Sequence, residues 1–152
     1  MFNLGKRWKL TVLYIYAIIY SLSGFAAAEP IHEAAKEGDL AKVKSLIAEG
    51  SDVNVDDETD STPLHWAARM GDKDIVELLI LKGANVDAAD NTNTTPLHWA
   101  ARAGHKDVAE LLIFKGANVN AADKMGANPL HLADQAGHQE VVDLLIKHGG
   151  HK

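Results

Sequence analysis

The sequence contains no cysteine, which excludes disulfide bonds, zinc–thiolate sites and a thiol nucleophile. Tryptophan, tyrosine and phenylalanine number only three each, and most of them lie before position 29. The rest of the chain must therefore pack mainly with alanine, leucine, isoleucine and valine, which suits closely packed helices. Hydrophobic residues still make up 47% of the chain against 24% charged residues, so the composition favours a folded core over disorder.

The sequence also lacks the residue groups that nucleophilic or phosphate chemistry needs. After residue 28, serine occurs only at positions 45, 51 and 61, and none of these lies in a Gly-x-Ser-x-Gly elbow. No glycine-rich loop has the spacing that cradles a phosphate. We therefore predict that the protein is not an enzyme, holds no cofactor and has no small-molecule substrate.

The segment at positions 1–28 differs from everything that follows. Three basic residues within positions 6–9 precede an apolar run at 10–20, and a group of three alanines ends at Ala28. This order of basic, apolar and small residues is typical of a secretory signal peptide, so we predict cleavage at about Ala28 and a secreted or periplasmic mature chain. The alternative is a membrane anchor over residues 10–28, although the apolar run is about half of the roughly 20 residues that a spanning helix needs.

Acidic residues outnumber basic ones, and loss of the segment at 1–28 would widen the difference. The whole chain has 15 Lys and Arg against 21 Asp and Glu, a formal charge of −6. Three of the basic residues and none of the acidic ones lie before residue 29, so the mature chain would carry 12 against 21, or −9. An acidic surface repels phosphate backbones, so we expect no nucleic-acid partner.

An internal repeat governs the rest of the sequence. The motif Thr-Pro-Leu-His-Trp-Ala-Ala-Arg at 62–69 recurs at 95–102, and 23 of the 33 positions in 62–94 are identical one repeat later. The only four prolines follow the same period, at positions 30, 63, 96 and 129. One such unit cannot bury its apolar face alone, so neighbouring units must stack.

Each unit has the pattern of two short helices followed by a polar loop. Thr62 is a good N-cap for the first helix, and Pro63 suits its first turn, where a missing N–H costs nothing. Gly71 ends that helix, and residues 74–81 form the second, which Lys-Gly then terminates. Residues 85–94 are polar and predict a hairpin-like finger.

In these motifs the sequence resembles the ankyrin-repeat family over residues 29–150. The resemblance rests on the Thr-Pro-Leu-His-x-Ala signature, the later Glu-Leu-Leu run and the Lys-Gly-Ala-Asn-Val tail, all in register. It implies an all-α repeat solenoid of stacked helix-turn-helix units with hairpin-like finger loops. The predicted division is a signal peptide at 1–28, a cap-like first repeat at 29–61, two full repeats at 62–94 and 95–127, and a truncated C-terminal repeat at 128–150.

The two ends of the predicted stack differ. The first repeat has Lys42 and Ser45 where the second has Ile75 and Leu78, which gives the polar outer face that a terminal unit needs. The last repeat keeps an apolar second helix, so its outer edge would leave apolar surface uncovered. This weakly capped edge is the basis of an alternative function, a self-associating scaffold or assembly protein, although a monomer is the favoured state.

Four histidines, at positions 32, 65, 98 and 131, invite interpretation as a metal site. One repeat separates each from the next, and stacked helix pairs lie roughly 10 Å apart, whereas zinc ligands must lie within about 2.1 Å of one ion. We therefore predict no metal site. The family resemblance implies instead that these histidines tie the finger loops to the helices by hydrogen bonds. His105 and His138 are expected to be exposed residues at helix starts.

Trp66 and Trp99 are the most informative side chains. At about 100° per residue, Trp66 lies about 200° from Leu64 around the helix axis, so it points away from the main core. It either fills a gap between neighbouring first helices or contributes to an aromatic row on a concave face. In the second case Arg69 or Arg102 would stack on a neighbouring indole. The sequence leaves both interpretations open.

The predicted function is a non-catalytic module that binds a folded protein partner through the concave face and the finger tips. The resemblance implies that specificity lies at those tips and just before the glycine that ends each first helix. The predicted binding residues on helices are Lys36, Glu37, Trp66, Arg69, Met70, Trp99, Arg102, Ala103, Gln135 and Ala136. Those on fingers are Glu58, Thr59, Asn91, Thr92, Lys124 and Met125. The acidic run at 52–60 is interpreted as a solvated loop, with a contact for a basic partner as the alternative.

Overall fold

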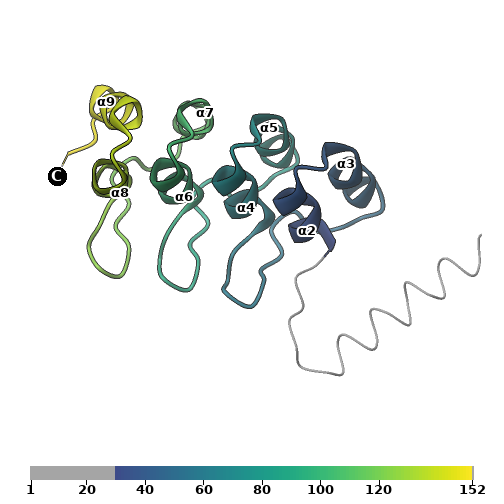
Figure 1. The fold of residues 1–152 in the computed structure, drawn as a ribbon. Helices are drawn as coiled ribbons and strands as arrows, with labels where there is room; N and C mark the ends of the chain where they lie inside the picture. The colour runs from purple at the N-terminus through teal and green to yellow at the C-terminus, as the bar shows by residue number, and fades with distance from the viewer. Residues whose placement is uncertain (1–29, 152) are drawn as a thin grey trace, which may run out of the picture.

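The computed structural model describes residues 30–151, which form eight helices arranged in four pairs (Figure 1). The helices are α2 (Pro30–Glu37), α3 (Leu40–Ala48), α4 (Pro63–Met70), α5 (Lys73–Leu81), α6 (Pro96–Ala103), α7 (Lys106–Phe114), α8 (Pro129–Ala136) and α9 (Gln139–Lys147). No β-strand occurs within this range, so the all-α repeat architecture is confirmed.

The first helix of each repeat begins and ends where its sequence dictates. In α4, Thr62 is the N-cap, Pro63 is the first helical residue and His65 completes a capping box. Gly71 ends the helix with a φ of 81°, in the left-handed region that residues with a Cβ avoid. Helices α6 and α8 repeat this arrangement.

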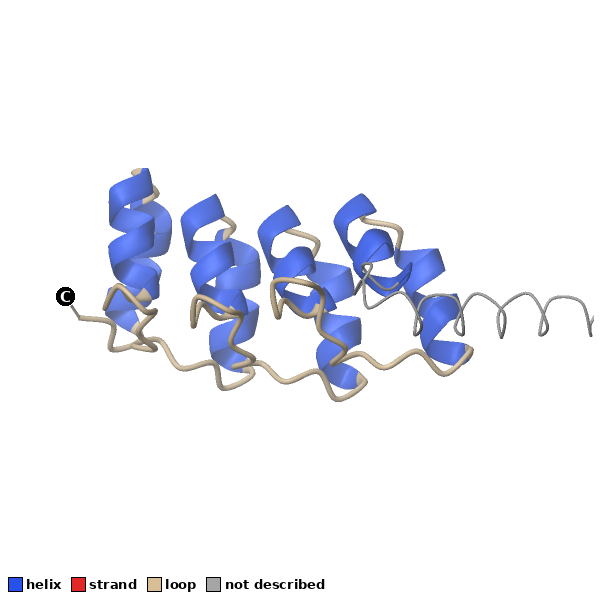
Figure 2. Cartoon of the chain, turned by 90° about the horizontal axis from the view of Figure 1, so that it is seen from below, coloured by secondary structure: helices blue, strands red, loops and turns tan. Residues whose placement is uncertain are grey.

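The helices stack in two layers. Helices α2, α4, α6 and α8 form an inner row and α3, α5, α7 and α9 an outer row, and each inner helix packs on the outer helix of its own repeat (Figures 1 and 2). Alanines such as Ala67, Ala68 and Ala100 are fully buried, which lets the inner helices approach closely. Leu64 of α4 and Leu79 of α5 belong to the same continuous core.

The loop that links one repeat to the next forms a finger, and the three fingers project side by side below the inner helices (Figure 1). They are joined by backbone hydrogen bonds. The N–H of Asn91 donates to the carbonyl of Thr59 at 3.0 Å, and the N–H of Lys124 donates to the carbonyl of Thr92 at 3.0 Å. The residue before the last finger position has a left-handed φ in all three fingers, of 57° at Asp60, 62° at Asn93 and 79° at Gly126.

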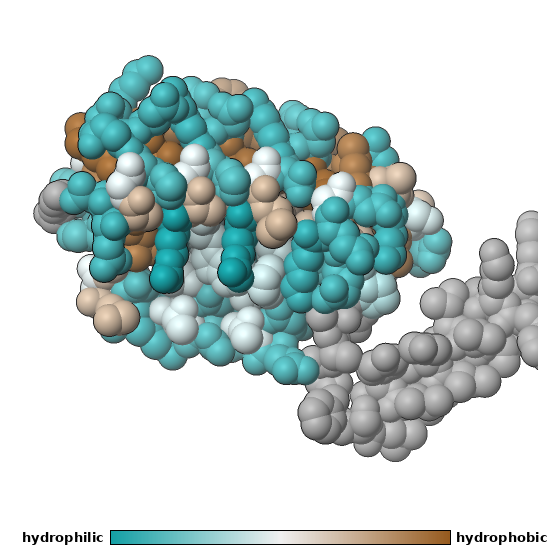
Figure 3. Space-filling view, viewed as in Figure 1, coloured by the Kyte–Doolittle hydropathy of each residue, from teal (hydrophilic) through white to brown (hydrophobic). Residues whose placement is uncertain are grey.

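The two ends of the stack differ as the sequence predicts. Lys42 and Ser45 of α3 are exposed, which gives the N-terminal repeat a polar outer face. At the other end Ile146 of α9 is 56% exposed, whereas its equivalents Ile80 and Ile113 are half-buried. Figure 3 shows hydrophobic residues reaching the surface at this end. The C-terminal edge therefore carries apolar surface that a further repeat would cover.

The predicted signal peptide, its cleavage at about Ala28 and the alternative anchor over residues 10–28 all lie outside the described residues and stay predictions. Within residues 30–151, none of the helices combines the length and apolar character needed to cross a bilayer. The residue boundaries assigned to the four repeats likewise stay predictions.

Candidate functional site

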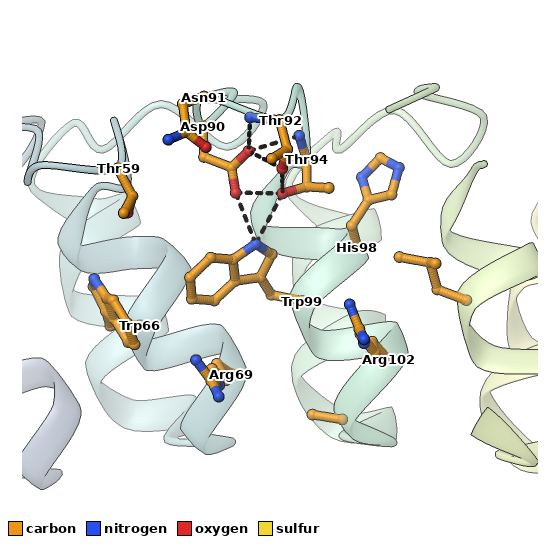
Figure 4. A pocket seen from close by; sticks show the side chains of 12 residues that line it. Thr59, Trp66, Arg69, Asp90, Asn91, Thr92, Thr94, His98, Trp99 and Arg102 are labelled. Atoms are coloured by element: carbon orange, nitrogen blue, oxygen red, sulfur yellow. Dashed lines mark hydrogen bonds between the residues drawn. The ribbon is translucent and has the colours of Figure 1, made fainter. Parts of the chain in front are cut away.

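A groove of about 650 Å³ lies between the fingers and the inner helices α4, α6 and α8 (Figure 4). Its lining residues are Thr59, Trp66, Arg69, Asp90, Asn91, Thr92, Thr94, His98, Trp99, Arg102, Ala103 and Leu132. The two indoles at its centre meet edge to face, with ring centroids 5.0 Å apart and an interplanar angle of 86°. They form one aromatic surface, and we call the site the tryptophan groove.

An aspartate at the base of the first finger fixes the first tryptophan. Nε1 of Trp66 donates to Oδ2 of Asp57 at 2.8 Å, while Oδ1 accepts from the N–H and the hydroxyl of Thr59 and from the N–H of Ser61. Asp57 is only 9% exposed, although most of the acidic run at 52–60 is exposed. The interpretation of that run as a solvated loop is therefore wrong at Asp57, because its carboxylate holds the finger to α4.

The same arrangement recurs one repeat later. Nε1 of Trp99 donates to Oδ2 of Asp90 at 3.1 Å and lies 3.0 Å from the hydroxyl of Thr94. Oδ1 of Asp90 accepts from the N–H and hydroxyl of Thr92 and from the N–H of Thr94, whose hydroxyl donates to Oδ2 (Figure 4). Both tryptophans are therefore half-buried residues that fill the space between neighbouring inner helices and also line the groove. The two positions that the sequence left open for the indoles are thus compatible.

The hydrogen bonds keep both aspartates ionised. Burial raises the pKa of Asp57, but hydrogen bonds from the finger and from the indole outweigh this effect and hold the pKa below its usual value. Burial also raises the pKa of Asp90, and the threonine hydrogen bonds again lower it by more. The negative charge of each carboxylate is thus engaged within its own finger.

Basic side chains lie on the opposite side of the indoles. The guanidinium carbon of Arg69 is 5.5 Å from the ring centroid of Trp66 and 5.6 Å from that of Trp99. Nζ of Lys36 lies 4.2 Å from the Trp66 ring and extends the row toward the N-terminal repeat. Figure 4 shows Arg69 and Arg102 on the side away from the finger residues. The predicted stacking is confirmed for Arg69, whereas Arg102 contacts no aromatic ring among residues 30–151.

Buried histidines join each repeat to the next finger. The N–H of Thr62 donates to Nδ1 of His65 at 3.0 Å, so Nδ1 carries no proton, and Nε2–H donates to the carbonyl of Thr94 at 3.1 Å. Nε2 of His98 reaches the carbonyl of Ala127 at 3.2 Å, and Nε2 of His32 reaches that of Ser61 at 3.0 Å. The role implied by the family resemblance is therefore confirmed for these three. In the described part of the chain no cluster of histidine and carboxylate side chains is arranged to hold a metal ion.

His105 and His138 also connect repeats. Nε2 of His105 donates to the carbonyl of Arg69 at 2.9 Å, and Nε2 of His138 donates to that of Arg102 at 3.2 Å. Both residues are half-buried, so the expectation that they are exposed is wrong, although both stand at helix starts. They fix the backbone from which the two arginines extend toward the tryptophan groove.

The tryptophan groove contains half of the predicted binding residues, namely Thr59, Trp66, Arg69, Asn91, Thr92, Trp99, Arg102 and Ala103. Lys36 extends it through the contact with Trp66. The other predicted residues are exposed but lie outside its lining, namely Glu37, Glu58, Met70, Lys124, Met125, Gln135 and Ala136. The finger tips and the ends of the inner helices thus surround the groove without lining it.

The two aspartates that fix the indoles are not among the predicted binding residues. A signal for them was present, because an aspartate stands nine positions before each tryptophan, at Asp57 and at Asp90. Two further lining residues, His98 and Leu132, are likewise absent from the predicted set. Leu132 occupies the tryptophan position of the fourth repeat and lines the groove there.

Comparison with known protein families agrees with this architecture of paired helices and fingers. The model of ankyrin repeats in three copies matches residues 31–123, and the model of a single ankyrin repeat matches residues 125–151. The chain belongs to the ankyrin-repeat family, whose repeats generally act as protein–protein interaction modules. A search of the curated proteins finds no match to the chain.

Replacing Asp90 with alanine should lower the free energy of unfolding by about 2 kcal/mol, because charge-assisted hydrogen bonds to Trp99 and two threonines are lost. Asp123 is the matched control, since it stands at the same position of the next repeat but receives hydrogen bonds only from two backbone N–H groups. Asp123→Ala should cost about half as much. Urea unfolding of both variants measures the difference, and equal losses would show that the indole and hydroxyl bonds contribute nothing.

Acid should destabilise the fold through the buried histidines. Burial lowers the pKa of His65 and of His98 below the ordinary value of 6.5, since a buried ring favours its neutral form. Each ring then binds a proton more readily in the unfolded chain. The contribution of the two rings to the free energy of unfolding is therefore complete above about pH 6.5, and it is lost as the pH falls toward their folded-state pKa values. The loss is at most about 1.4 kcal/mol per pH unit for each ring.

Urea unfolding at several pH values between about 7.5 and 5 measures this slope, with His98→Gln as the control that removes one titrating ring. The aspartates do not interfere, because Asp57 and Asp90 lose their contributions only below their ordinary pKa of 3.8. The slope should fall by about half in the variant. A slope that is the same in both proteins would contradict the assignment.

Proposed function

We propose that the protein binds a folded protein partner, without catalysis, through the tryptophan groove and the finger tips beside it. The observation that carries this proposal is the juxtaposition of Trp66, Trp99 and Arg69 on one accessible concave surface. Tryptophan and arginine are the side chains that most often dominate binding energy at protein interfaces. A surface already held by hydrogen bonds loses little conformational entropy on binding, which favours affinity.

The engagement of the ionisable groups supports binding over catalysis. Both ring nitrogens of His98 hold hydrogen bonds to the backbone, and both oxygens of Asp90 hold hydrogen bonds within the finger. Neither group is free to take a proton from a bound molecule, as a general base must. We therefore propose no reaction at this site.

Capture of a partner by the immobilised chain tests the proposal, when the unchanged chain is compared with a groove variant and a control variant. The groove variant changes four lining residues, Trp66, Arg69, Trp99 and Arg102, and the exposed neighbour Met70 to alanine. The control changes five exposed residues away from the tryptophan groove to alanine, namely Glu77, Lys82, Glu110, Lys115 and Glu140. Circular dichroism first establishes that both variants are folded. The groove variant should lose the partner and the control should retain it, while retention by both would remove the proposal.

We also propose that the chain acts outside the cytoplasm. The support for this proposal is the order of basic, apolar and small residues along positions 1–28. Amino-terminal sequencing of the protein recovered from the cells that make it tests this, and a first residue at about Glu29 is the expected result. A chain that begins at Met1 and sediments with membranes would support the anchor over residues 10–28 instead.

A second candidate function is self-association through the C-terminal edge. Ile146 is 56% exposed there, and Nε2 of His131 has no hydrogen-bond partner among residues 30–151, unlike the buried histidines. A second copy of the chain would cover this edge. Sedimentation of the chain over a range of concentrations distinguishes the candidates. A monomer mass at every concentration removes self-association, whereas a larger mass that the Ile146→Glu variant does not reach would support it.

A further inference from the structure

The charges of the tryptophan groove are not balanced within the protein. Oδ1 and Oδ2 of Asp57 and of Asp90 all accept hydrogen bonds from finger residues or indoles. The guanidiniums of Arg69 and Arg102, by contrast, donate no hydrogen bond and form no ion pair to any residue in 30–151. Each has five N–H donors, so the groove offers many donors and no free carboxylate.

Arg69 is also held in place. Its guanidinium lies within 5.6 Å of both indole centroids, so the aromatic faces restrict where it can point. Its backbone carbonyl is fixed by His105, and that of Arg102 by His138. A cation that is positioned before binding is suited to bidentate recognition of a carboxylate.

Three basic residues stand in one row although the chain as a whole is acidic, with a formal charge of −6. Lys36, Arg69 and Arg102 occupy equivalent positions of successive repeats, so they form a basic row along the ends of the inner helices. Lys36 alone has an acidic partner, Glu33 at 2.8 Å. Neighbouring inner helices stand about 10 Å apart, so the row presents positive charges at about that interval.

We propose that the partner binds the tryptophan groove with an acidic segment, whose carboxylates pair with Arg69 and Arg102 while an apolar side chain covers the indoles. This inference rests on the proposed function and specifies the partner's chemistry. Residues seven apart on one face of a helix are separated by about 10.5 Å, which matches the interval between the two arginines. The expected segment is therefore a helix with Asp or Glu at positions i and i+7.

A protein segment fits this site better than a nucleic acid does. The exposed residues Asp56, Glu58 and Asp60 are close in sequence to Thr59, which lines the groove. Their carboxylates would repel a polyanion at every phosphate near them, whereas a segment with two carboxylates exposes little charge to them. Duplex DNA carries a charge about every 1.7 Å, far more densely than the basic row can neutralise. Two carboxylates on a helix match the two arginines without surplus charge.

The test is selection from a random-peptide library displayed on phage, with the purified chain as bait. The chain carries Trp8→Phe, so that Trp66 and Trp99 are its only tryptophans and their fluorescence reports occupation of the groove. The test variant is Arg69→Gln with Arg102→Gln. The control, Lys82→Gln with Lys115→Gln, removes the same charge from the ends of the outer helices. All four residues are exposed, so we expect the fold to be retained, and circular dichroism of both variants checks this.

Selected peptides should be enriched in Asp and Glu and should change the tryptophan fluorescence. Their affinity should fall at least about tenfold in the arginine variant and change less than about twofold in the lysine control. Peptides that occupy the groove without enrichment in Asp and Glu would overturn the inference that the partner's segment is acidic. The proposed function would still stand. A single-stranded oligonucleotide that binds in an arginine-dependent way would also overturn the inference, in favour of a nucleic-acid ligand. If no peptide changes the fluorescence, the acidic segment is overturned, while the capture experiment with the groove variant decides the proposed function.

Discussion

Replacing His65 with alanine should lower the free energy of unfolding by about 3 to 5 kcal/mol. The imidazole is fully buried and connects two repeats, since it accepts from the N–H of Thr62 and donates to the carbonyl of Thr94. Alanine leaves the N–H of Thr62 unpaired and removes one of the two hydrogen bonds to the carbonyl of Thr94, which keeps the bond from the N–H of Asp90. It also opens a cavity and removes the edge contact with Trp99 at 5.4 Å. Urea unfolding followed by circular dichroism measures the loss.

His131 provides the matched control for this prediction, because it stands at the same position of the last repeat. It is half-buried, and its hydrogen bonds reach only Asn128. His131→Ala should therefore cost about 1 kcal/mol, the loss of a local cap without an inter-repeat bond. Equal losses at His65 and His131 would show that the link between repeats contributes little to stability.

Replacing Gly104 with alanine should cost about 2 to 3 kcal/mol, although only one methyl group is added. Two effects add here. The residue has a φ of 78°, which strains any residue with a Cβ, and a Cβ at this position would stand 2.5 Å from Nδ1 of His138. The imidazole must then move and lose its hydrogen bond to the carbonyl of Arg102.

Gly126→Ala separates the two effects. Gly126 has nearly the same φ, 79°, but a Cβ there would meet nothing within 4 Å. Its cost should be about 1 kcal/mol, the conformational part alone. Thermal or urea unfolding of the two variants gives the comparison. If Gly126→Ala is as costly as Gly104→Ala, the contact between the glycine and the imidazole has no energetic weight.

The sequence predicts the architecture because each repeat carries its own local instructions. The N-cap at Thr62, the proline that follows it and the left-handed glycine at Gly71 define α4 without reference to the rest of the chain. The regular period of the motif then requires the units to stack. The polar face at Lys42 and Ser45 and the uncovered edge at Ile146 follow from the same comparison of repeats.

The candidate site is less readily predicted, because it depends on how the finger of one repeat folds over a helix. Helical geometry places Trp66 away from the core but does not show which residue receives its N–H. The loop backbone brings Asp57 within 2.8 Å of it, and this turns an apparently solvated acid into a buried one. Likewise, the burial of His105 depends on the neighbouring repeat and not on its own helix. Predicting the contacts between repeats requires the angle at which neighbouring repeats stack, and that angle cannot be read from the composition.

The claim that the tryptophan groove is where a protein partner binds can be tested directly by site-specific photocrosslinking in the cells that make the protein. A photoreactive phenylalanine derivative is placed either at Ala103, which lines the groove, or at Glu110, which is exposed on the outer helix α7. We predict a covalent adduct with one other protein from position 103 and none from position 110. Adducts from position 110 alone, or from neither position, would contradict the account.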